Sequence, residues 1–358
     1  MTSPAAARLL SPEEIALRAG GEIPFIHFPE RSTAFGEREM RLRQLAGGHA
    51  MQDYLLFVAA LAKAQGRVLN GSIDVELPSA EQIERAAKAG ESVLSAMFWK
   101  RDPRWAALLR DLLGHVEKGL DESPARTAVR ALAARDDAWI EAQADRLLAG
   151  VMLGLDLASA PLVAAGLQTY FTHLVIATQA AGAGARLAPF GRTDDETVCP
   201  CCASRPTASV TRIGAAEAGY RYLACSLCSA QWHVVRIKCS HCLSTKGISY
   251  QSLSLAGEGL DRVGGDAVDS NARTSGPVEG ATTTDRAVQV ECCGECGHYL
   301  KIVHMERDPN VEPIADDLAS LTLDLLASEA GDLRHGVNLM LLFGDPDAPA
   351  ELPDGGGG

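Results

Sequence analysis

Apolar positions in the first half of this 358-residue chain recur at the three- and four-residue spacing of amphipathic helices. Residues 37–185 are rich in Ala, Leu, Arg and Glu, and strand-like alternation is scarce among them. One helical stripe follows Gly48 and consists of Met51, Tyr54, Leu55, Val58 and Leu61. The pattern predicts a helical bundle. We interpret its stripes as core packing rather than a cofactor pocket, since apolar helical faces are mostly buried.

Two further helices are predicted in this half. One begins at about Asp137, and its main apolar residues are Trp139, Leu147, Leu148, Val151 and Leu155. The next begins at Ser159, has Pro161 in its first turn and is apolar nearly all round, which predicts a central place in the bundle. Its most apolar stretch, residues 161–178, is too short and too often interrupted by polar residues to predict a membrane span.

The hydrophobic pattern changes near Ala185, where the helical spacing ends. Residues 191–196 form a polar linker. The β-prone runs beyond it are 208–213, 220–223, 232–237, 248–253, 287–290 and 299–303. Residues 254–286 lack hydrophobic periodicity and hold six glycines, so we expect a long mobile loop there.

A last helix is predicted to start near Pro313, with a buried stripe of Ile314, Leu318, Leu321 and Leu325. Residues 354–358 are expected to be disordered. The whole pattern predicts an α+β fold in three parts. An N-terminal α-helical bundle covers residues 1–190, a metal-binding module covers 191–304, and a C-terminal helix with a tail covers 305–358.

All ten cysteines lie in the β-prone part, and eight of them form four Cys-x-x-Cys knuckles. The knuckles are Cys199/Cys202, Cys225/Cys228, Cys239/Cys242 and Cys293/Cys296. One knuckle offers two thiolates to a metal ion, and two knuckles complete a tetrahedral site with four cysteine ligands. We therefore predict two closed four-cysteine metal sites in a tandem rubredoxin-like or zinc-ribbon module. Free or redox-paired thiols are the weaker interpretation.

Two questions about these sites stay open at the level of sequence. The knuckles could pair in adjacent order or interleave as in cross-braced zinc domains, and adjacent order is favoured because sequential elements usually pack together. The spacing does not choose between structural zinc and redox-active iron. Cys201 and Cys292 lie beside knuckles and are left out of the ligand sets. The nearby His233, His241 and His298 are also expected outside them, since thiolates already fill both sites.

The net charge and the absence of known motifs reduce the number of function classes that the sequence supports. The formal net charge of −13 argues against a general binder of nucleic acids or membrane surfaces, although a local basic stripe runs from Arg205 to Lys246. Residues 1–20 contain no long apolar run of the kind found in signal peptides, so a cytoplasmic location is expected. The sequence contains no P-loop, G-x-G-x-x-G, G-x-S-x-G or H-E-x-x-H motif, which favours a protein that is not an enzyme.

The stretch from Tyr220 to Cys242 resembles the core of the formate dehydrogenase accessory protein (FdhE) family. The stretch from Cys293 to Ile302 resembles it too, and so do Asp308-Pro309 and the run from Ala315 to Leu321. The helical half is compatible with the family, in residues 41–54 and 160–168. The likeness extends over residues 22–344, and its cysteine-rich part is the specific one.

The resemblance implies a cytosolic maturation factor for respiratory formate dehydrogenases, which binds their catalytic subunit through the Cys-x-x-Cys module. It favours iron in rubredoxin-like sites, with zinc as the other possibility. The competing functions are a rubredoxin-like electron-transfer protein and a zinc-ribbon nucleic-acid binder. One departure from common knuckles is Ala203, which occupies a position where glycine often adopts φ > 0. Alanine there would cost about 1 kcal/mol.

Five residues are candidates for contacts with the catalytic subunit. Trp232, Arg236 and Lys238 are expected between the two metal sites, and ordinary packing and solvation is the simpler role for them. Asp316 and Asp317 lie in the first turn of the last helix. There a favourable interaction with the helix dipole is the simpler role.

Overall fold

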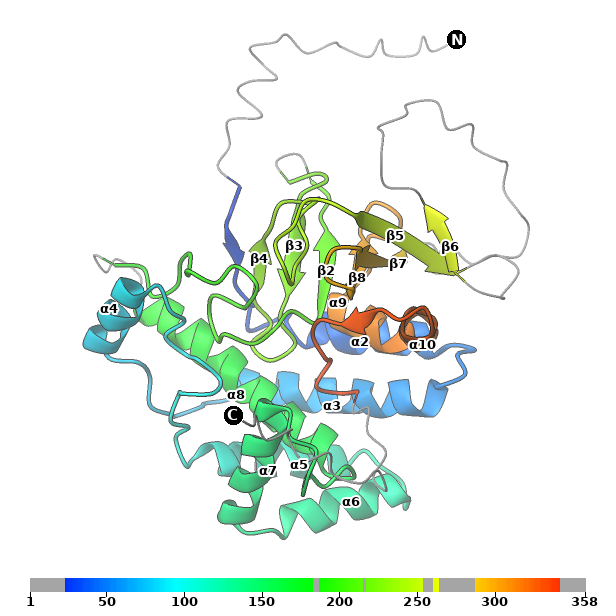
Figure 1. Cartoon of the computed structure of the whole chain (residues 1–358). Helices are drawn as coiled ribbons and strands as arrows, with labels where there is room; N and C mark the ends of the chain where they lie inside the picture. The colour runs from blue at the N-terminus through cyan, green and yellow to red at the C-terminus, as the bar shows by residue number, and fades with distance from the viewer. Residues whose placement is uncertain (1–22, 183–186, 215–216, 254–259, 264–286, 342–358) are drawn as a thin grey trace, which may run out of the picture.

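The N-terminal half folds into helices that lie beneath a sheet built by the cysteine-rich half (Figure 1). The computed structural model describes residues 23–182, 187–214, 217–253, 260–263 and 287–341. The helices of this half are α2 (Gly36–Ala46), α3 (Gln52–Asn70), α4 (Ala80–Ala89), α5 (Trp105–Glu117), α6 (Pro124–Ala133), α7 (Asp137–Ala149) and α8 (Ala160–Ala181). The predictions for residues 1–20 and 354–358 lie outside the described residues.

Helix α8 is the centre of the bundle, as its all-round apolarity predicts. It packs against α3, α5 and α7, and Pro161 lies in its first turn. The helix has 22 residues and a mean hydropathy of 1.3 over its most apolar window, so the expectation that it is too short to cross a membrane was wrong. That window is 83% buried inside the protein, which is the environment of a core helix.

Helix α7 starts where predicted but ends earlier. The side chain of Asp136 caps its start by accepting a hydrogen bond from the backbone N–H of Trp139 at 2.8 Å. Gly150 ends the helix in a left-handed conformation with φ of 69°. The expectation that Val151 and Leu155 extend its apolar face was therefore wrong, and the side chain of Val151 is 45% exposed.

The cysteine-rich half forms one sheet with the strand order β1-β4-β3-β2-β8-β7-β5-β6, and β9 also pairs with β8. The strands are β1 (Ile26–His27), β2 (Ala208–Thr211), β3 (Arg221–Ala224), β4 (Gln231–His233), β5 (Ile248–Leu253), β6 (Leu260–Val263), β7 (Val288–Cys293), β8 (His298–His304) and β9 (Leu333–Arg334). Every predicted β-prone run overlaps a strand. Strand β6 lies inside the predicted loop of residues 254–286, which corrects that expectation at residues 260–263, and the rest of the loop lies outside the described residues.

Two ribbon units merge in this sheet through a parallel pairing of β2 and β8. Residue Ala208 lies opposite Lys301 and Thr211 lies opposite His304. Strands β2, β3 and β4 form the first unit, and β5, β7 and β8 form the second. Strand β1 extends the first unit by pairing with β4, so a segment from before the helical bundle becomes part of the ribbon.

The predicted C-terminal helix is two helices, α9 (Pro313–Ala319) and α10 (Leu321–Glu329), and the prediction of one continuous helix was wrong. Two interactions compete with helix continuation at this point. The hydroxyl of Ser320 donates to the carbonyl of Asp316 at 2.7 Å, and Lys301 Nζ donates to the carbonyl of Asp317 at 2.5 Å. The change of direction leaves Leu325 56% exposed instead of buried.

Helix α9 lies between the bundle and the sheet, in contact with α2, β2 and β8. Arg41 of α2 holds Asp316 with Nη2 at 2.6 Å from Oδ1 and Nε at 2.9 Å from Oδ2. Asp317 pairs with Lys301 of β8 at 2.9 Å and with Arg334 of β9 at 2.6 Å. These buried ion pairs connect α9 to α2, β8 and β9.

Candidate metal centres

The four knuckles share one backbone geometry. In each, the residue after the second cysteine is left-handed, and its N–H donates to the carbonyl of the first cysteine at 2.8 to 3.1 Å. These residues are Ala203 (φ 58°), Ser229 (φ 60°), Leu243 (φ 61°) and Gly297 (φ 67°). The left-handed conformation that the sequence suggested at Ala203 is confirmed. The same strained position recurs at Ser229 and Leu243, where an L-residue costs about 1–2 kcal/mol.

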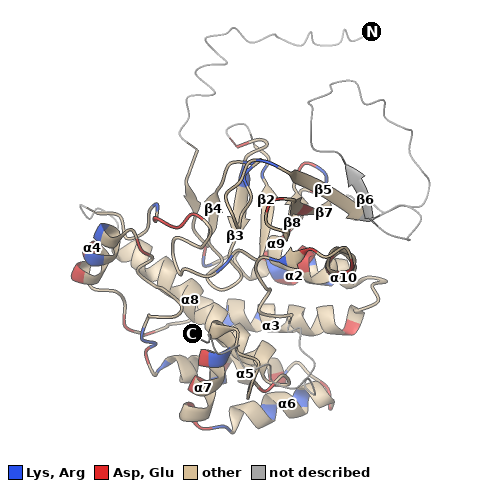
Figure 2. Cartoon of the chain, viewed as in Figure 1, with Lys and Arg blue, Asp and Glu red and all other residues tan. Residues whose placement is uncertain are grey.

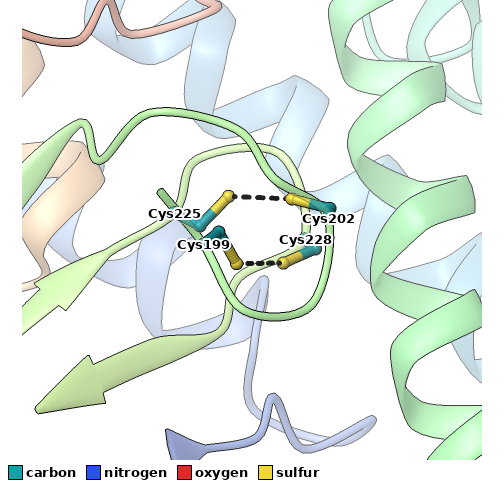
Figure 3. A group of neighbouring side chains, drawn as sticks. All are labelled: Cys199, Cys202, Cys225 and Cys228. Carbon is teal, nitrogen blue, oxygen red and sulfur yellow. Dashed lines mark hydrogen bonds between the residues drawn. The ribbon is translucent and has the colours of Figure 1, made fainter. Parts of the chain in front are cut away.

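The knuckles pair in adjacent order, as favoured from the sequence. Cys199, Cys202, Cys225 and Cys228 form one cluster, called site one (Figure 3). Cys239, Cys242, Cys293 and Cys296 form the other, called site two. In each cluster the four sulfur atoms lie within 4.8 Å of one another.

The spacing of the sulfur atoms fits a tetrahedral ion. In site one the Sγ atoms of Cys199 and Cys228 lie 3.5 Å apart, as do those of Cys202 and Cys225. The corresponding distances in site two are 3.8 Å and 3.7 Å. Four thiolates at about 2.3 Å from a central ion would be separated by about 3.8 Å. The distances are too long for disulfides, whose sulfur atoms are bonded at about 2.05 Å.

The chemistry of site one also fits a cation. Burial raises the pKa of Cys199, Cys202 and Cys228 well above that of a free thiol. Hydrogen bonds with Cys199 and the other two thiols instead lower the pKa of Cys225. Without added positive charge, this buried cluster would hold few thiolates at neutral pH. A divalent ion at its centre would stabilise all four, because coordination deprotonates thiols.

Site one lies at the junction of the sheet and the helical bundle. The segment after α4 binds the first knuckle through three hydrogen bonds. Ser92 Oγ donates to the carbonyl of Cys199 at 2.9 Å, and the N–H groups of Leu94 and Ala96 donate to those of Cys201 and Cys202. The four cysteines of the site are at most 1% exposed and belong to the same hydrophobic core as the helices. An ion here would crosslink the first two knuckles and hold in place the surface on which the helical half packs.

Site two, by contrast, is open to solvent. Cys242 is exposed and Cys296 is partly exposed, whereas Cys239 and Cys293 are buried. Two imidazoles stack beside it, those of His241 and His298, with ring centroids 3.7 Å apart and planes within 7° of parallel. The ring of His335 packs edge-on against His241 at 5.0 Å. No sequence motif identified His335 as part of this site, because it lies far from the knuckles in the C-terminal part of the chain.

The two extra cysteines lie outside both four-sulfur clusters. Cys201 is buried beside site one, and its carbonyl accepts the hydrogen bond from Leu94. Cys292 lies on β7, next to site two in sequence, and its sulfur accepts a hydrogen bond from Gln251 Nε2 at 3.5 Å. The geometry therefore favours the Cys-x-x-Cys frame in both knuckles that have an additional cysteine.

Four of the five candidate contact residues have partners inside the protein. Trp232 is 1% exposed, and its Nε1 donates to the carbonyl of Glu196 at 3.4 Å. Lys238 pairs with the carboxylate of Glu196 at 2.6 Å. Asp316 and Asp317 are at most 1% exposed, so neither carboxylate is available to a partner. Arg236 is exposed.

The two aspartates differ in what they stabilise. Asp316 accepts the N–H of Glu312 at 2.8 Å, next to the start of α9, in keeping with the predicted interaction at a helix N-terminus. Burial opposes ionisation of Asp317, but the positive charges of Arg334 and Lys301 hold its pKa below the ordinary value. Asp317 therefore remains charged inside the protein.

The fold and the sites together define the class of the protein: a helical bundle is joined to a sheet that carries two zinc-ribbon-like four-cysteine clusters. Models of the FdhE N-terminal domain, central domain and C-terminal domain match residues 23–184, 198–236 and 275–341. The "Protein FdhE homolog" of Cronobacter sakazakii and the "Protein FdhE" of Salmonella typhimurium are each 32% identical to the chain over 328 residues. Those alignments cover 92% of this chain and 94% of each relative.

The fold agrees with this comparison. The crystal structure of the FdhE protein from Pseudomonas aeruginosa superposes with a TM-score of 0.69 at 31% identity, covering 90% of this chain and 100% of that one. The chain belongs to the FdhE family.

Proposed function

We propose that this protein is a non-enzymatic accessory factor that acts in the cytoplasm in the assembly or activation of respiratory formate dehydrogenase. The observation that carries the proposal is membership of the FdhE family, with a curated relative aligned over 92% of this chain. Family membership supports a role related to formate dehydrogenase. It favours neither a free-standing electron-transfer protein nor a nucleic-acid binder.

The distribution of charge also argues against nucleic acid as the partner. Positively and negatively charged residues are interspersed along the described elements (Figure 2). In the basic stripe, three residues are paired with acids: Arg212 with Glu217, Arg221 with Glu291, and Lys238 with Glu196. The stripe therefore offers few free cations to a phosphate backbone.

We assign different roles to the two metal sites. Site one, buried between bundle and sheet, would stabilise the fold, and a structural ion contributes on the order of 10 kcal/mol to a small module. Site two is accessible and would be the one that a partner meets. The four-sulfur donor set suits iron or zinc, and the family resemblance favours iron. Iron would supply one-electron chemistry, whereas zinc would supply only charge and crosslinking.

The surface segment between β4 and the third knuckle is the proposed contact with the catalytic subunit. Val235 and Ile237 are 53% and 58% exposed, and Arg236 between them is exposed as well. The carbonyl of Arg236 accepts a hydrogen bond from the hydroxyl of Tyr250 at 3.3 Å, so the backbone is held while the side chains face solvent. Exposed apolar residues flanking an arginine are typical of interaction sites.

The test is anaerobic co-purification with the catalytic subunit of a formate dehydrogenase. The variant Ile237→Glu is expected to lose capture while keeping its metal content. Leu325→Glu changes an apolar residue of similar exposure (56%) on α10 and is expected to capture as well as the unmodified chain. Equal capture by both variants would place the contact elsewhere. Failure of the intact, folded chain to capture the subunit would refute the accessory role in this form.

A second pair of variants separates docking from metal. The double change Cys242→Ser, Cys296→Ser removes half of site two at the surface. The change Cys225→Ser, Cys228→Ser removes half of site one in the core and is expected to disrupt folding. Loss of capture by the folded site-two variant would support a metal-organised docking surface. Retained capture would leave site two a role other than docking.

A further inference from the structure

Two imidazoles lie directly beside the exposed metal site, and the ligand set of site two does not use them. His241 is the residue before the ligand Cys242, and His298 follows the ligand Cys296 by two positions. A nitrogen from each ring and the sulfur of Cys296 lie within 4.8 Å of one another. Cys296 belongs to this group and to site two at once.

The nitrogens of this pair are available for coordination. His298 Nδ1 lies 3.0 Å from the carbonyl of Cys296, so this nitrogen carries the proton and Nε2 has its lone pair free. The Nδ1 atom of His241 is buried and has no hydrogen-bond partner among the described residues. The edge of the His335 ring packs against His241 and supports its position. Both rings and Cys296 are partly exposed, so an ion could reach them from solvent.

We propose that His241, His298 and Cys296 form an outer metal site that takes up a divalent transition-metal ion beside site two. Two imidazoles and a thiolate suit borderline ions such as Zn²⁺, Co²⁺ and Fe²⁺. Three protein ligands leave a fourth position open to water or to an incoming ligand. The inference rests on the proposed metal binding at site two, which shares Cys296.

Coordination requires one movement. An imidazole nitrogen binds an ion in the plane of its ring, so two parallel stacked rings cannot both bind the same ion. One ring must turn about its terminal torsion, which has a broad, soft profile in histidine. His298 is partly exposed and is the ring with room to turn, whereas the ring of His335, 3% exposed, is confined.

Because Cys296 is a ligand of both sites, an ion could pass from the outer site into site two. An ion held by the two neutral imidazoles and the Cys296 thiolate would exchange the imidazoles for Cys239, Cys242 and Cys293. Three thiols would lose their protons to solvent as three metal–sulfur bonds form, while two metal–nitrogen bonds and the bond to the water in the fourth position break. No electron transfer is involved. The outer site would thus serve loading or release of the ion in site two.

The test uses protein with zinc in both four-cysteine sites, because zinc is silent in visible spectra. Anaerobic addition of Co²⁺ alone is expected to produce thiolate-to-cobalt charge-transfer absorption and tetrahedral d–d bands, with both zinc ions retained. The variant His241→Ala, His298→Ala is expected to keep its zinc and to lose the cobalt bands. His115→Ala, which changes a partly exposed histidine on α5, serves as the matched control and is expected to retain them.

Three results would overturn the outer site. They are the absence of cobalt–thiolate bands in the intact chain, undiminished bands in the double variant, and release of zinc in proportion to cobalt bound. The last result would mean that cobalt merely replaces zinc in site two. Metal analysis before cobalt is added reports separately on the four-cysteine sites, so a chain that fails to hold zinc or iron there contradicts the proposed function instead.

Discussion

The buried charges around Asp317 provide a quantitative test of how the C-terminal helices are attached to the sheet. Lys301 and Arg334 carry two positive charges, and Asp317 and Asp324 carry two negative ones, at distances of 2.6 to 2.9 Å. The side chains of Lys301 and Asp317 have no exposed area. The perturbation is Asp317→Asn, which keeps the shape and leaves the two cations facing a single carboxylate.

The expected loss of unfolding free energy is about 3–5 kcal/mol, because removing one partner leaves an uncompensated buried charge. Lys301→Met is expected to cost a similar amount for the opposite reason, an excess of negative charge. The double variant Asp317→Asn, Lys301→Met removes one charge of each sign and leaves the Arg334–Asp324 pair intact. It is expected to recover most of the loss, since neutral replacement of a buried pair is often tolerated.

The assay is urea denaturation at pH 7 followed by far-ultraviolet circular dichroism, with metal content measured for each variant. Glu329→Gln, at the exposed end of α10, is the control and is expected to lie within about 0.5 kcal/mol of the unmodified chain. The reasoning is refuted if Asp317→Asn is no less stable than the control. It is also refuted if the double variant loses the sum of both single losses, because coupling between the charges would then be absent.

Three further predictions concern the metal sites and pH. A chelator at neutral pH is expected to remove the ion of site two before that of site one, because only site two has exposed ligands; a single phase of metal release would contradict this. Ala203→Gly is expected to raise the unfolding free energy by about 1 kcal/mol and Gly297→Ala to lower it similarly, as measured by denaturant midpoints; unchanged midpoints in both would exclude strain at these turns. His304 is buried between Thr211 and Gln289, and burial lowers its pKa from 6.5 to about 4. The unfolded chain therefore binds a proton that the folded chain excludes, and stability should fall as the pH drops from 6.5 toward 4. His304→Gln should flatten this dependence in unfolding curves taken across that range, and an unaltered slope would assign it to other groups.

Features that depend only on a short stretch of sequence could be predicted. The Cys-x-x-Cys spacing indicated four knuckles, and each β-prone run overlaps a strand, because turn geometry and strand alternation are local properties. The all-round apolarity of α8 predicted its central position. The left-handed backbone at Ala203 followed from the knuckle itself. In these cases the interacting residues lie within a few positions of one another.

What depends on distant contacts was decided only by the tertiary structure. The parallel pairing of β2 with β8 merges two ribbons into one sheet, and nothing in either strand specifies the other. Asp317 looked like a helix-dipole residue until Lys301 and Arg334 were brought to it. The same holds for the difference between the metal sites, whose knuckles have the same Cys-x-x-Cys spacing. Site one is buried because the helical bundle covers it, site two is left open, and burial depends on what packs above a knuckle rather than on its spacing.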